Sequence, residues 1–432
     1  MDRSRASHRA RKLPWKTWYT YAGQPDATHV GPSANPTQVA RVLGDGSTQL
    51  SQFEYNAIGR RTKASDPVGR VTNSVYDTTN IDLLTVYQRN PSGSSFDPGG
   101  AHADKIAGCT YNGLHEPLTA TDAAGQTTNY SYNPYGQLMS VQNARLETTS
   151  YGYGDGSSGK PIGYLTSITS PVFNGSSAVT SFTYDGFNRI RTVTDTDGYA
   201  VTTDYDSLDR KTKITYPDAT YQQFQYTDNV TAVMTLDLTG SRDRRGLWTY
   251  RHYNANRQMD SITDPQNRTT QYGWCTCGAL TSITDPKQQV TLFNRDIESR
   301  VYQKVFNDNT TIDYLYEGQT APNTAGATSR MKSSTDPKNQ RTNYTYLADE
   351  NVAQITYTDT SGQPLSPATP SVSFTYDPNY NRAKTMVDGT GSTVYAYNAV
   401  TVPAALGAAQ LSSIDGPLAN DTITFSYDEL AG

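Results

Sequence analysis

One short phrase recurs from end to end of this chain, and it constrains the fold more than any other feature. Aromatic residues, usually two of them separated by one residue, lead into Asp or Asn, a turn, and then Arg or Gln. Residues 182–189 and 203–210 are two copies, the second beginning 21 residues after the first. A fixed period of this size is typical of repeat architectures, so we interpret the whole chain as an array of one small unit.

Each aromatic pair predicts a β-strand with one aromatic face. Residues i and i+2 point to the same face of a strand, whereas on a helix they do not. No long segment has the apolar spacing of an amphipathic helix, so we expect almost no helix. We predict that the structural aromatics of the repeats are Phe53, Tyr55, Tyr130, Tyr132, Phe182, Tyr184, Tyr205, Phe224, Tyr226, Tyr253, Tyr344, Tyr346, Phe374, Tyr376, Tyr395, Tyr397, Phe425 and Tyr427.

Two kinds of turn alternate between the predicted strands. The Tyr-Asp turn directly follows the repeat Tyr, and its fourth residue is of a type that tolerates positive φ, as Asn188 does after Tyr184. The Asp-Pro turn begins at an Asp eleven residues after the Tyr, as at Asp195, and often has Pro next. Its fourth residue is Gly or Asn, which is the pattern of a type I turn. Each period is therefore predicted to be a β-hairpin joined to the next hairpin by a second turn.

The predicted fold class is all-β, a continuous coiled strip of tandem antiparallel hairpins. A lone hairpin is marginal in water, so each must dock on its neighbours. Burying one aromatic removes roughly 150–250 Å² from solvent, an upper value of about 4–6 kcal/mol. We expect roughly 15 to 17 hairpins over residues 15–432, following the repeat period. Residues 1–14 are expected to form a basic, disordered tail, and the Pro- and Gly-rich stretch near 90–100 a long hairpin tip.

Composition supports a folded β protein and excludes several classes of function. Apolar residues make up only 35% of the 432 residues, whereas Tyr (32) and Gly (33) are abundant. A net charge of −5, with no basic cluster after the first dozen residues, gives no reason to expect nucleic acid as a partner. We find no signal peptide and no apolar stretch long enough to insert into a membrane. Localisation stays unknown at this stage.

Three local patterns that could carry chemistry are better explained by turns. Residues 154–161 match most of a phosphate-binding loop, but Pro161 replaces the required Ser or Thr and a strand-like segment follows. Cys275 and Cys277 could offer two thiolates to a metal, yet structural zinc needs four ligands, and the sequence leaves open whether they are paired. The acidic turns lack the calcium-binding loop pattern. We therefore predict no catalytic residue, no cofactor and no metal.

The two recurring turns resemble the YD repeat of RHS proteins. The likeness spans Trp15 to Gly432, and residues 264–270, with the sequence Asp-Pro-Gln-Asn-Arg-Thr-Thr, carry it clearly. Residues 274–280 also resemble a degenerate repeat of bacterial members. The resemblance implies a β-sheet strip that coils into a hollow shell. In bacterial RHS proteins and the Tc toxin C component such a shell encloses a C-terminal toxin, and in teneurins it takes part in cell-surface recognition. Full-length relatives are secreted or cell-surface proteins.

Three function hypotheses follow from these patterns. The first is a non-enzymatic shell segment that encapsulates or presents a C-terminal effector outside this chain, with the remainder of the same polypeptide and delivery proteins as partners. The second is a binding module for carbohydrate or another cell-surface partner, because exposed aromatic rows can stack on sugars. The third, an enzyme, would need a cleft with convergent polar groups that the repeats do not predict. We find no core cleavage segment or toxin domain, so the chain is expected to be part of a repeat region.

Overall fold

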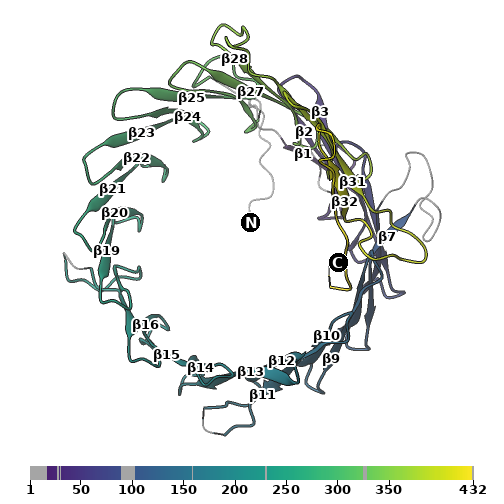
Figure 1. Cartoon of the computed structure of the whole chain (residues 1–432), viewed down its shortest axis with the longest axis vertical. Coiled ribbons are helices and arrows are strands. Elements are labelled where there is room, and N and C mark those ends of the chain that lie inside the picture. Colours follow the sequence, from purple (N-terminus) through teal and green to yellow (C-terminus); the bar gives the residue numbers. More distant parts are fainter. Residues whose placement is uncertain are drawn as a thin grey trace. The chain divides into compact units, whose positions relative to one another are not determined.

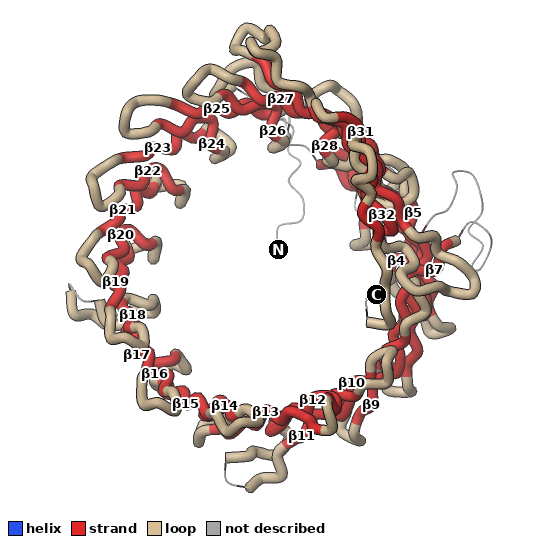
Figure 2. Tube along the Cα trace, viewed as in Figure 1, coloured by secondary structure: helices blue, strands red, loops and turns tan. Residues whose placement is uncertain are grey.

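The computed structural model describes residues 17–26, 29, 31–88, 103–157, 159–228, 231–324 and 328–430. Within these ranges the chain forms 33 β-strands and no helix. Figure 2 shows the strands in red, joined by loops and turns in tan. The prediction of an all-β array of antiparallel hairpins is therefore confirmed. The expected basic tail (1–14) and the long tip near 90–100 lie outside the described residues, so both stay predictions.

The chain divides into two compact units. Unit 1 contains residues 1–108, 295–303 and 311–426, and unit 2 contains residues 109–294, 304–310 and 427–432. The strands that begin in unit 1 are β1 (Thr17–Tyr21), β2 (Pro36–Val42), β3 (Thr48–Tyr55), β4 (Arg61–Ser65), β5 (Val71–Tyr76), β6 (Leu83–Gln88), β7 (Asp104–Tyr111), β24 (Val301–Val305), β25 (Thr311–Tyr316), β26 (Met331–Thr335), β27 (Arg341–Tyr346), β28 (Val352–Thr358), β29 (Val372–Tyr376), β30 (Ala383–Asp388), β31 (Gly391–Tyr397), β32 (Leu411–Asp415) and β33 (Ile423–Thr424).

Unit 2 holds an uninterrupted series of strands. They are β8 (Pro117–Asp122), β9 (Thr127–Tyr132), β10 (Leu138–Gln142), β11 (Thr148–Tyr153), β12 (Leu165–Phe173), β13 (Ser176–Tyr184), β14 (Ile190–Thr194), β15 (Ala200–Tyr205), β16 (Lys211–Thr215), β17 (Tyr221–Gln225), β18 (Gly240–Arg242), β19 (Trp248–Tyr253), β20 (Met259–Thr263), β21 (Thr269–Trp274), β22 (Leu280–Thr284) and β23 (Val290–Arg295).

Strands that follow one another in sequence pair antiparallel within each unit. In the middle of unit 2, Thr183 pairs with Thr192 between β13 and β14, and Thr192 pairs with Thr202 between β14 and β15. The register shifts between Thr183 and Tyr184, where the repeat Tyr closes the strand. Equivalent shifts precede Tyr55, Tyr205, Tyr253, Tyr316, Tyr346, Tyr376 and Tyr397. A bulge of this kind increases the local twist and redirects a side chain, here at the end of the strand where the Tyr stands.

The Tyr-Asp and Asp-Pro turns share one geometry although their sequences differ. In the Tyr-Asp turn at Asp185, the Asn188 N–H donates to the Asp185 carbonyl, and the Asp185 carboxylate accepts from the N–H groups of Phe187 and Arg189. The Asp-Pro turn at Asp264 repeats every one of these bonds with residues 266–268. An Asp at the first position therefore fixes both turns by bonding its own backbone.

At the positions predicted from residue type, the fourth residue of the turn has positive φ. The predicted positions are confirmed, with φ of 83° at Gly59, 79° at Gly136, 62° at Asn188, 61° at Asp209, 89° at Gly69, 79° at Gly125, 80° at Gly198, 60° at Asn267, 62° at Asn339 and 136° at Gly391. Because antiparallel strands alternate in direction, all Tyr-Asp turns of a unit lie along one edge of its strip and all Asp-Pro turns lie along the other.

Half-buried side chains are the rule in these strands. Every residue of β15, β19 and β25 is half-buried, and the fully buried apolar side chains among the described residues are Leu43, Ala124 and Ala408. Burial therefore comes chiefly from cross-strand neighbours in the same sheet. Polar links between strands must then carry an unusual share of the stability.

Some turns place a longer side chain in the strained left-handed region, and this generates a first prediction. Gln288 has φ of 64° in the Asp-Pro turn that starts at Asp285. Left-handed backbone costs an L-residue about 1–2 kcal/mol, and glycine gives back roughly 0.5–1 kcal/mol through its unfolded-state freedom. We therefore expect Gln288→Gly to raise the free energy of unfolding by about 0.5–1 kcal/mol in urea titrations.

The matched control is Gly198→Ala, at the same turn position with φ of 80° and no atom within 4 Å of the added Cβ. This variant should lose stability through backbone strain alone. A Gln288→Gly variant less stable than the parent would contradict the strain argument.

Candidate functional site

The predicted repeat aromatics lie where the sheet half-buries them. All of them are half-buried except Phe425, which is 39% exposed. None is packed into a fully enclosed core, so the rings are shielded by the strands beside them. The expectation that these rings hold the array together stays a prediction, and the contacts they make indicate how it would work.

The second aromatic of most pairs uses its polar tip to bind the neighbouring strand. The hydroxyl of Tyr205 donates to the carbonyl of Ile190 at 2.9 Å, and Ile190 is the first residue of β14. In β21, Trp274 takes the place of Tyr and its indole N–H donates to the carbonyl of Met259. The same bond is made by Tyr55, Tyr76, Tyr153, Tyr184, Tyr226, Tyr253, Tyr316, Tyr346, Tyr376 and Tyr397. A buried Tyr hydroxyl needs such a partner, and here the partner ties one repeat to another.

The Arg that ends the Tyr-Asp turn links that turn to the following repeat. Arg210 donates through Nε to Asp206 at 2.7 Å, and its guanidinium lies 4.0 Å from the ring centroid of Tyr226. A further nitrogen of the same guanidinium donates to the carbonyl of Thr235. Equivalent stacking joins Arg189 to Tyr205, Arg300 to Tyr316, Arg330 to Tyr346 and Arg382 to Tyr397. One side chain thus contacts a carboxylate, a ring and a backbone carbonyl at once.

A neutral version of the link explains why some repeats end in Gln. Asn254 donates to the side-chain oxygen of Gln258, and Gln258 in turn donates to the carbonyl of Gly278 in the next Tyr-Asp turn. Asn133 and Gln137 repeat the arrangement, with Gln137 donating to Gly163. Consecutive turns are therefore connected in two equivalent ways, by an Arg paired with Asp or by a Gln paired with Asn.

The surroundings of the linking residues shift the pKa values of their Asp and Tyr side chains. Burial would raise the pKa of Asp206, but hydrogen bonds from the Arg210 side chain and from backbone N–H groups lower it below its usual range. Asp185 behaves in the same way beside Arg189. Burial raises the pKa of the Tyr226 hydroxyl. The folded structure therefore favours a charged Asp and a neutral Tyr.

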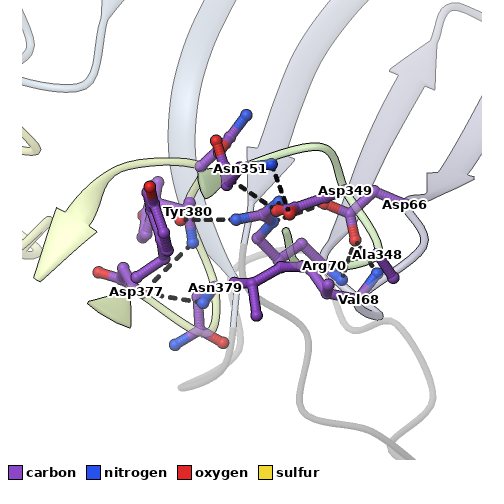
Figure 3. Close-up of polar contacts among 12 residues, drawn as sticks. Asp66, Val68, Arg70, Ala348, Asp349, Asn351, Asp377, Asn379 and Tyr380 are labelled. Atoms are coloured by element: carbon purple, nitrogen blue, oxygen red, sulfur yellow. Dashed lines mark hydrogen bonds and ion pairs between the residues drawn. The ribbon is translucent and has the colours of Figure 1, made fainter. Parts of the chain in front are cut away.

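A second kind of contact, within unit 1, joins early repeats to late ones. In Figure 1, β2 and β3 lie near β27, and a hydrogen bond from Gln49 in β3 to the carbonyl of Ala348, just after β27, shows that these segments are in contact. Figure 3 shows Arg70, from the Asp-Pro turn that starts at Asp66, pointing toward Asp349 and Tyr380 from two late Tyr-Asp turns. Arg70 pairs with Asp66 and Asp349, and it donates to the carbonyl of Tyr380. The side chains of Arg70 and Asp349 are each only 4% exposed. We call this contact the seam.

Further polar bonds extend the seam on both sides of Arg70. Gln49 donates to the carbonyl of Ala348, and Gln88 donates to the carbonyl of Asn379, each at 2.7 Å. The Tyr380 hydroxyl donates to Asp104 at 2.6 Å. Burial, reinforced by the Asp104 carboxylate, raises the pKa of Tyr380. Asp-Pro turns and strand residues of the early edge thus bind Tyr-Asp turns of the late edge.

The seam residues were missed by reasoning from sequence. Arg70, Asp349 and Tyr380 fall in ordinary turn positions, and their partners are hundreds of residues apart in sequence. One signal could have indicated Arg70. It ends an Asp-Pro turn, and inside its own hairpin its charge can pair only with Asp66, so a second partner could have been expected elsewhere. The partner Asp349 carries no mark that separates it from other turn acids.

The patterns that could have held a ligand form turns. The loop that resembles a phosphate-binding motif leads into strand β12, and no helix follows within the described residues. Cys275 and Cys277 form a disulfide, which answers the question that the sequence left open. Across the part of the chain that the structure describes, no three His, Cys, Asp or Glu side chains are grouped to hold a metal. In those same residues there is no helix of the length and hydropathy that a membrane span requires.

A family model described as Teneurin YD-shell matches residues 101–292. This match covers the same alternating turns whose geometry is given above. Residues 101–292 are therefore similar to the YD-shell family. Within the matched residues, each linking Arg binds the Asp of its own turn and the Tyr of the next repeat, as Arg210 does with Asp206 and Tyr226. No curated protein matches the chain.

Two solved structures have a fold similar to that of this chain. They are the crystal structure of TcdB2-TccC3-TEV, with a TM-score of 0.62, and the Tc holotoxin pore of Photorhabdus luminescens, with a TM-score of 0.61. Each is 13% identical to this chain and the similarity covers 89% of it. At this identity the likeness shows the fold alone. The chain spans 21% of the length of those chains.

Loss of one Tyr hydroxyl tests the first kind of link. Tyr226→Phe removes the bond to the Lys211 carbonyl and leaves the ring in place. A net hydrogen bond contributes about 0.5–1.5 kcal/mol, so we expect a loss of about 1 kcal/mol in the free energy of unfolding. Tyr135→Phe, at a ring that is 87% exposed, is the control and should change nothing. Equal effects in the two variants would contradict the assigned role.

Loss of Arg70 tests the seam. Removing one partner of a buried ion pair leaves the other unpaired, which typically costs roughly 3–5 kcal/mol. We expect Arg70→Gln to lower the unfolding free energy by this order and to raise amide exchange in residues 347–351. Arg245→Gln, at a side chain that is 78% exposed, should cost little. Unchanged exchange in 347–351 would show that Arg70 does not hold the late turns.

Acid should weaken the links. The pKa of Asp206 is lowered on folding, and a hydrogen bond from Thr79 lowers the pKa of Asp77 to about 2. Depressed carboxylate pKa values contribute stability above the unfolded value of about 3.9, and that stability is lost as pH falls through the folded values. We expect thermal midpoints to change little from pH 7 to 5 and to fall below about pH 4. A midpoint that rises on acidification would contradict this sign.

Proposed function

We propose that this chain is a wall segment of a YD-repeat shell, with a structural rather than a catalytic role. The observation that carries the proposal is the seam, in which Arg70, Gln49 and Gln88 bind turns of late repeats along a strip edge. A wall built from a narrow strip needs adjacent rows that bond edge to edge. Without such a contact, the turns along the edges of the strip would have no partner in another row.

The comparisons support the same role. The Teneurin YD-shell model matches residues 101–292, and both similar structures contain Tc toxin components. The polar side chains of the repeats are engaged in links between turns, so the repeat pattern supplies no convergent catalytic groups. A structural role accounts for the recurrence of Tyr, Asp and Arg at equivalent places.

The finer part of the proposal is that the wall encloses an effector segment of the same polypeptide. The partners would then be the rest of that polypeptide and the other components of its toxin complex, in analogy with the Tc structures. The alternative, carbohydrate binding, would have to use exposed turn rings such as Tyr135 and Phe187, which are 87% and 80% exposed. Several linking Tyr rings already contact a guanidinium, namely Tyr205, Tyr226, Tyr316, Tyr346 and Tyr397.

Limited proteolysis of the natural gene product that contains these repeats tests enclosure. Wild-type protein should yield a protease-protected segment from outside the repeats, and this segment should become cleavable when Arg70→Gln opens the seam. Arg245→Gln serves as the control and should keep the protection. Absence of any protected segment, or equal cleavage in all three proteins, would overturn enclosure. Specific binding on a glycan array that is lost in a Tyr135→Ala Phe187→Ala double variant would favour the alternative.

A further inference from the structure

One Tyr-Asp turn of unit 2 differs from the others because a cysteine takes the place of its Asp and a second cysteine follows two residues later. Cys275 and Cys277 form a disulfide between β21 and β22, with their Cα atoms 5.1 Å apart. This distance lies in the usual range for disulfides, roughly 4.4–6.8 Å. Cys275 occupies the position that Asp185 and Asp206 hold in their turns, and Ala279 stands where those turns have Arg. The charged link is therefore absent from this turn, and a covalent bond is present.

The backbone of this turn is shaped by the same bonds as the other turns. The Cys275 N–H donates to the Ala279 carbonyl at 2.9 Å, and the Gly278 N–H donates to the Cys275 carbonyl at 3.0 Å. Gly278 has φ of 87°, as expected for the fourth turn residue. The Ala279 N–H also donates to Cys275 Sγ, the atom that takes the place of the Asp oxygen. None of these bonds depends on the link between the two sulfurs.

The preceding repeat holds the turn from outside. Gln258 donates to the Gly278 carbonyl at 3.1 Å, and the Trp274 indole donates to the Met259 carbonyl at 3.0 Å. The turn would consequently keep its shape with two free thiols, and those thiols would stay side by side. A pair that is preorganised in this way recloses readily, because the second thiol is always close to the first.

The two sulfurs differ in access. Cys277 lies exposed at the turn tip, whereas Cys275 is half-buried. Thiol–disulfide exchange requires an incoming thiolate to reach one sulfur in line with the bond, so access selects the sulfur that is attacked. Attack at Cys277 makes Cys275 the leaving thiolate.

We propose that Cys275 and Cys277 form a reversible thiol–disulfide couple, which a small thiol opens and the corresponding small-molecule disulfide closes while the surrounding sheet stays folded. The thiolate of one small thiol bonds to Cys277 Sγ, the Cys275–Cys277 bond breaks, and Cys275 takes a proton from water. A second thiolate then attacks the sulfur of the first small thiol, which is bound to Cys277. This step releases the small-molecule disulfide and expels Cys277 as a thiolate, which takes a proton from water to become a thiol. The protein gains two electrons, and two small thiols are oxidised.

Glutathione redox titration followed by acid quench, alkylation and mass measurement tests the couple. All proteins carry Cys109→Ser, which removes the remaining, free thiol. We expect Cys275 and Cys277 to become alkylated together, in one two-electron transition, with an unchanged strand signal in circular dichroism. Amide exchange should increase only in residues 275–279 on reduction.

Single-cysteine variants test the order of attack. With Cys275→Ser, the remaining Cys277 should take up glutathione at least several-fold faster than Cys275 does in the Cys277→Ser variant. Two alkylated thiols at every ratio of glutathione forms would show that no disulfide forms and would overturn the proposal. Reduction that occurs only in denaturant would overturn it as well, because the couple would then not operate in the folded sheet. Faster uptake at Cys275 would overturn the assigned attack at Cys277.

Discussion

A guanidinium held between a carboxylate of its own turn and an aromatic ring of the next repeat is the interaction on which the rest of this structure depends. Arg300 shows it in the most buried form. Its partner Asp296 is 1% exposed, its own side chain is 9% exposed, and it lies 4.4 Å from the ring centroid of Tyr316. Because Arg presents several donors in a rigid plane, it can satisfy the carboxylate, a carbonyl and the ring together. A Lys, with a single compact charge, could not do so.

The structure depends on these links because a single layer of sheet buries its side chains only in part. Strands whose side chains are mostly half-buried recover only part of the hydrophobic free energy that a closed core provides. Links between consecutive turns supply additional stability locally, and they also fix the spacing of hairpins along the strip. The seam at Arg70 uses the same chemistry over a long sequence distance, since it again joins a turn acid, a guanidinium and a carbonyl. The same kinds of interaction therefore join consecutive hairpins along the strip and join early to late repeats in unit 1.

The parts of the fold that could be predicted are the local ones. The period-2 aromatic pairs gave the strands, and the residue types at the fourth turn position predicted left-handed backbone at Asn188 and Gly69. Both depend on interactions within a few residues. The Arg70–Asp349 pair could not be predicted, because nothing in either turn encodes which distant turn it meets. The disulfide of Cys275 with Cys277 likewise needed the turn geometry, since the residue types alone allowed free thiols, a metal or a bond.

A double-mutant cycle on Arg300 and Tyr316 tests the central claim most directly. The unfolding free energies of Arg300→Met, Tyr316→Leu and the double variant would be measured against the parent protein. If the guanidinium and the ring act as one link, the effects should be non-additive, with a coupling energy of about 1–2 kcal/mol. Additivity within about 0.3 kcal/mol would mean that the two side chains contribute independently, and the account of how the repeats are joined would be wrong.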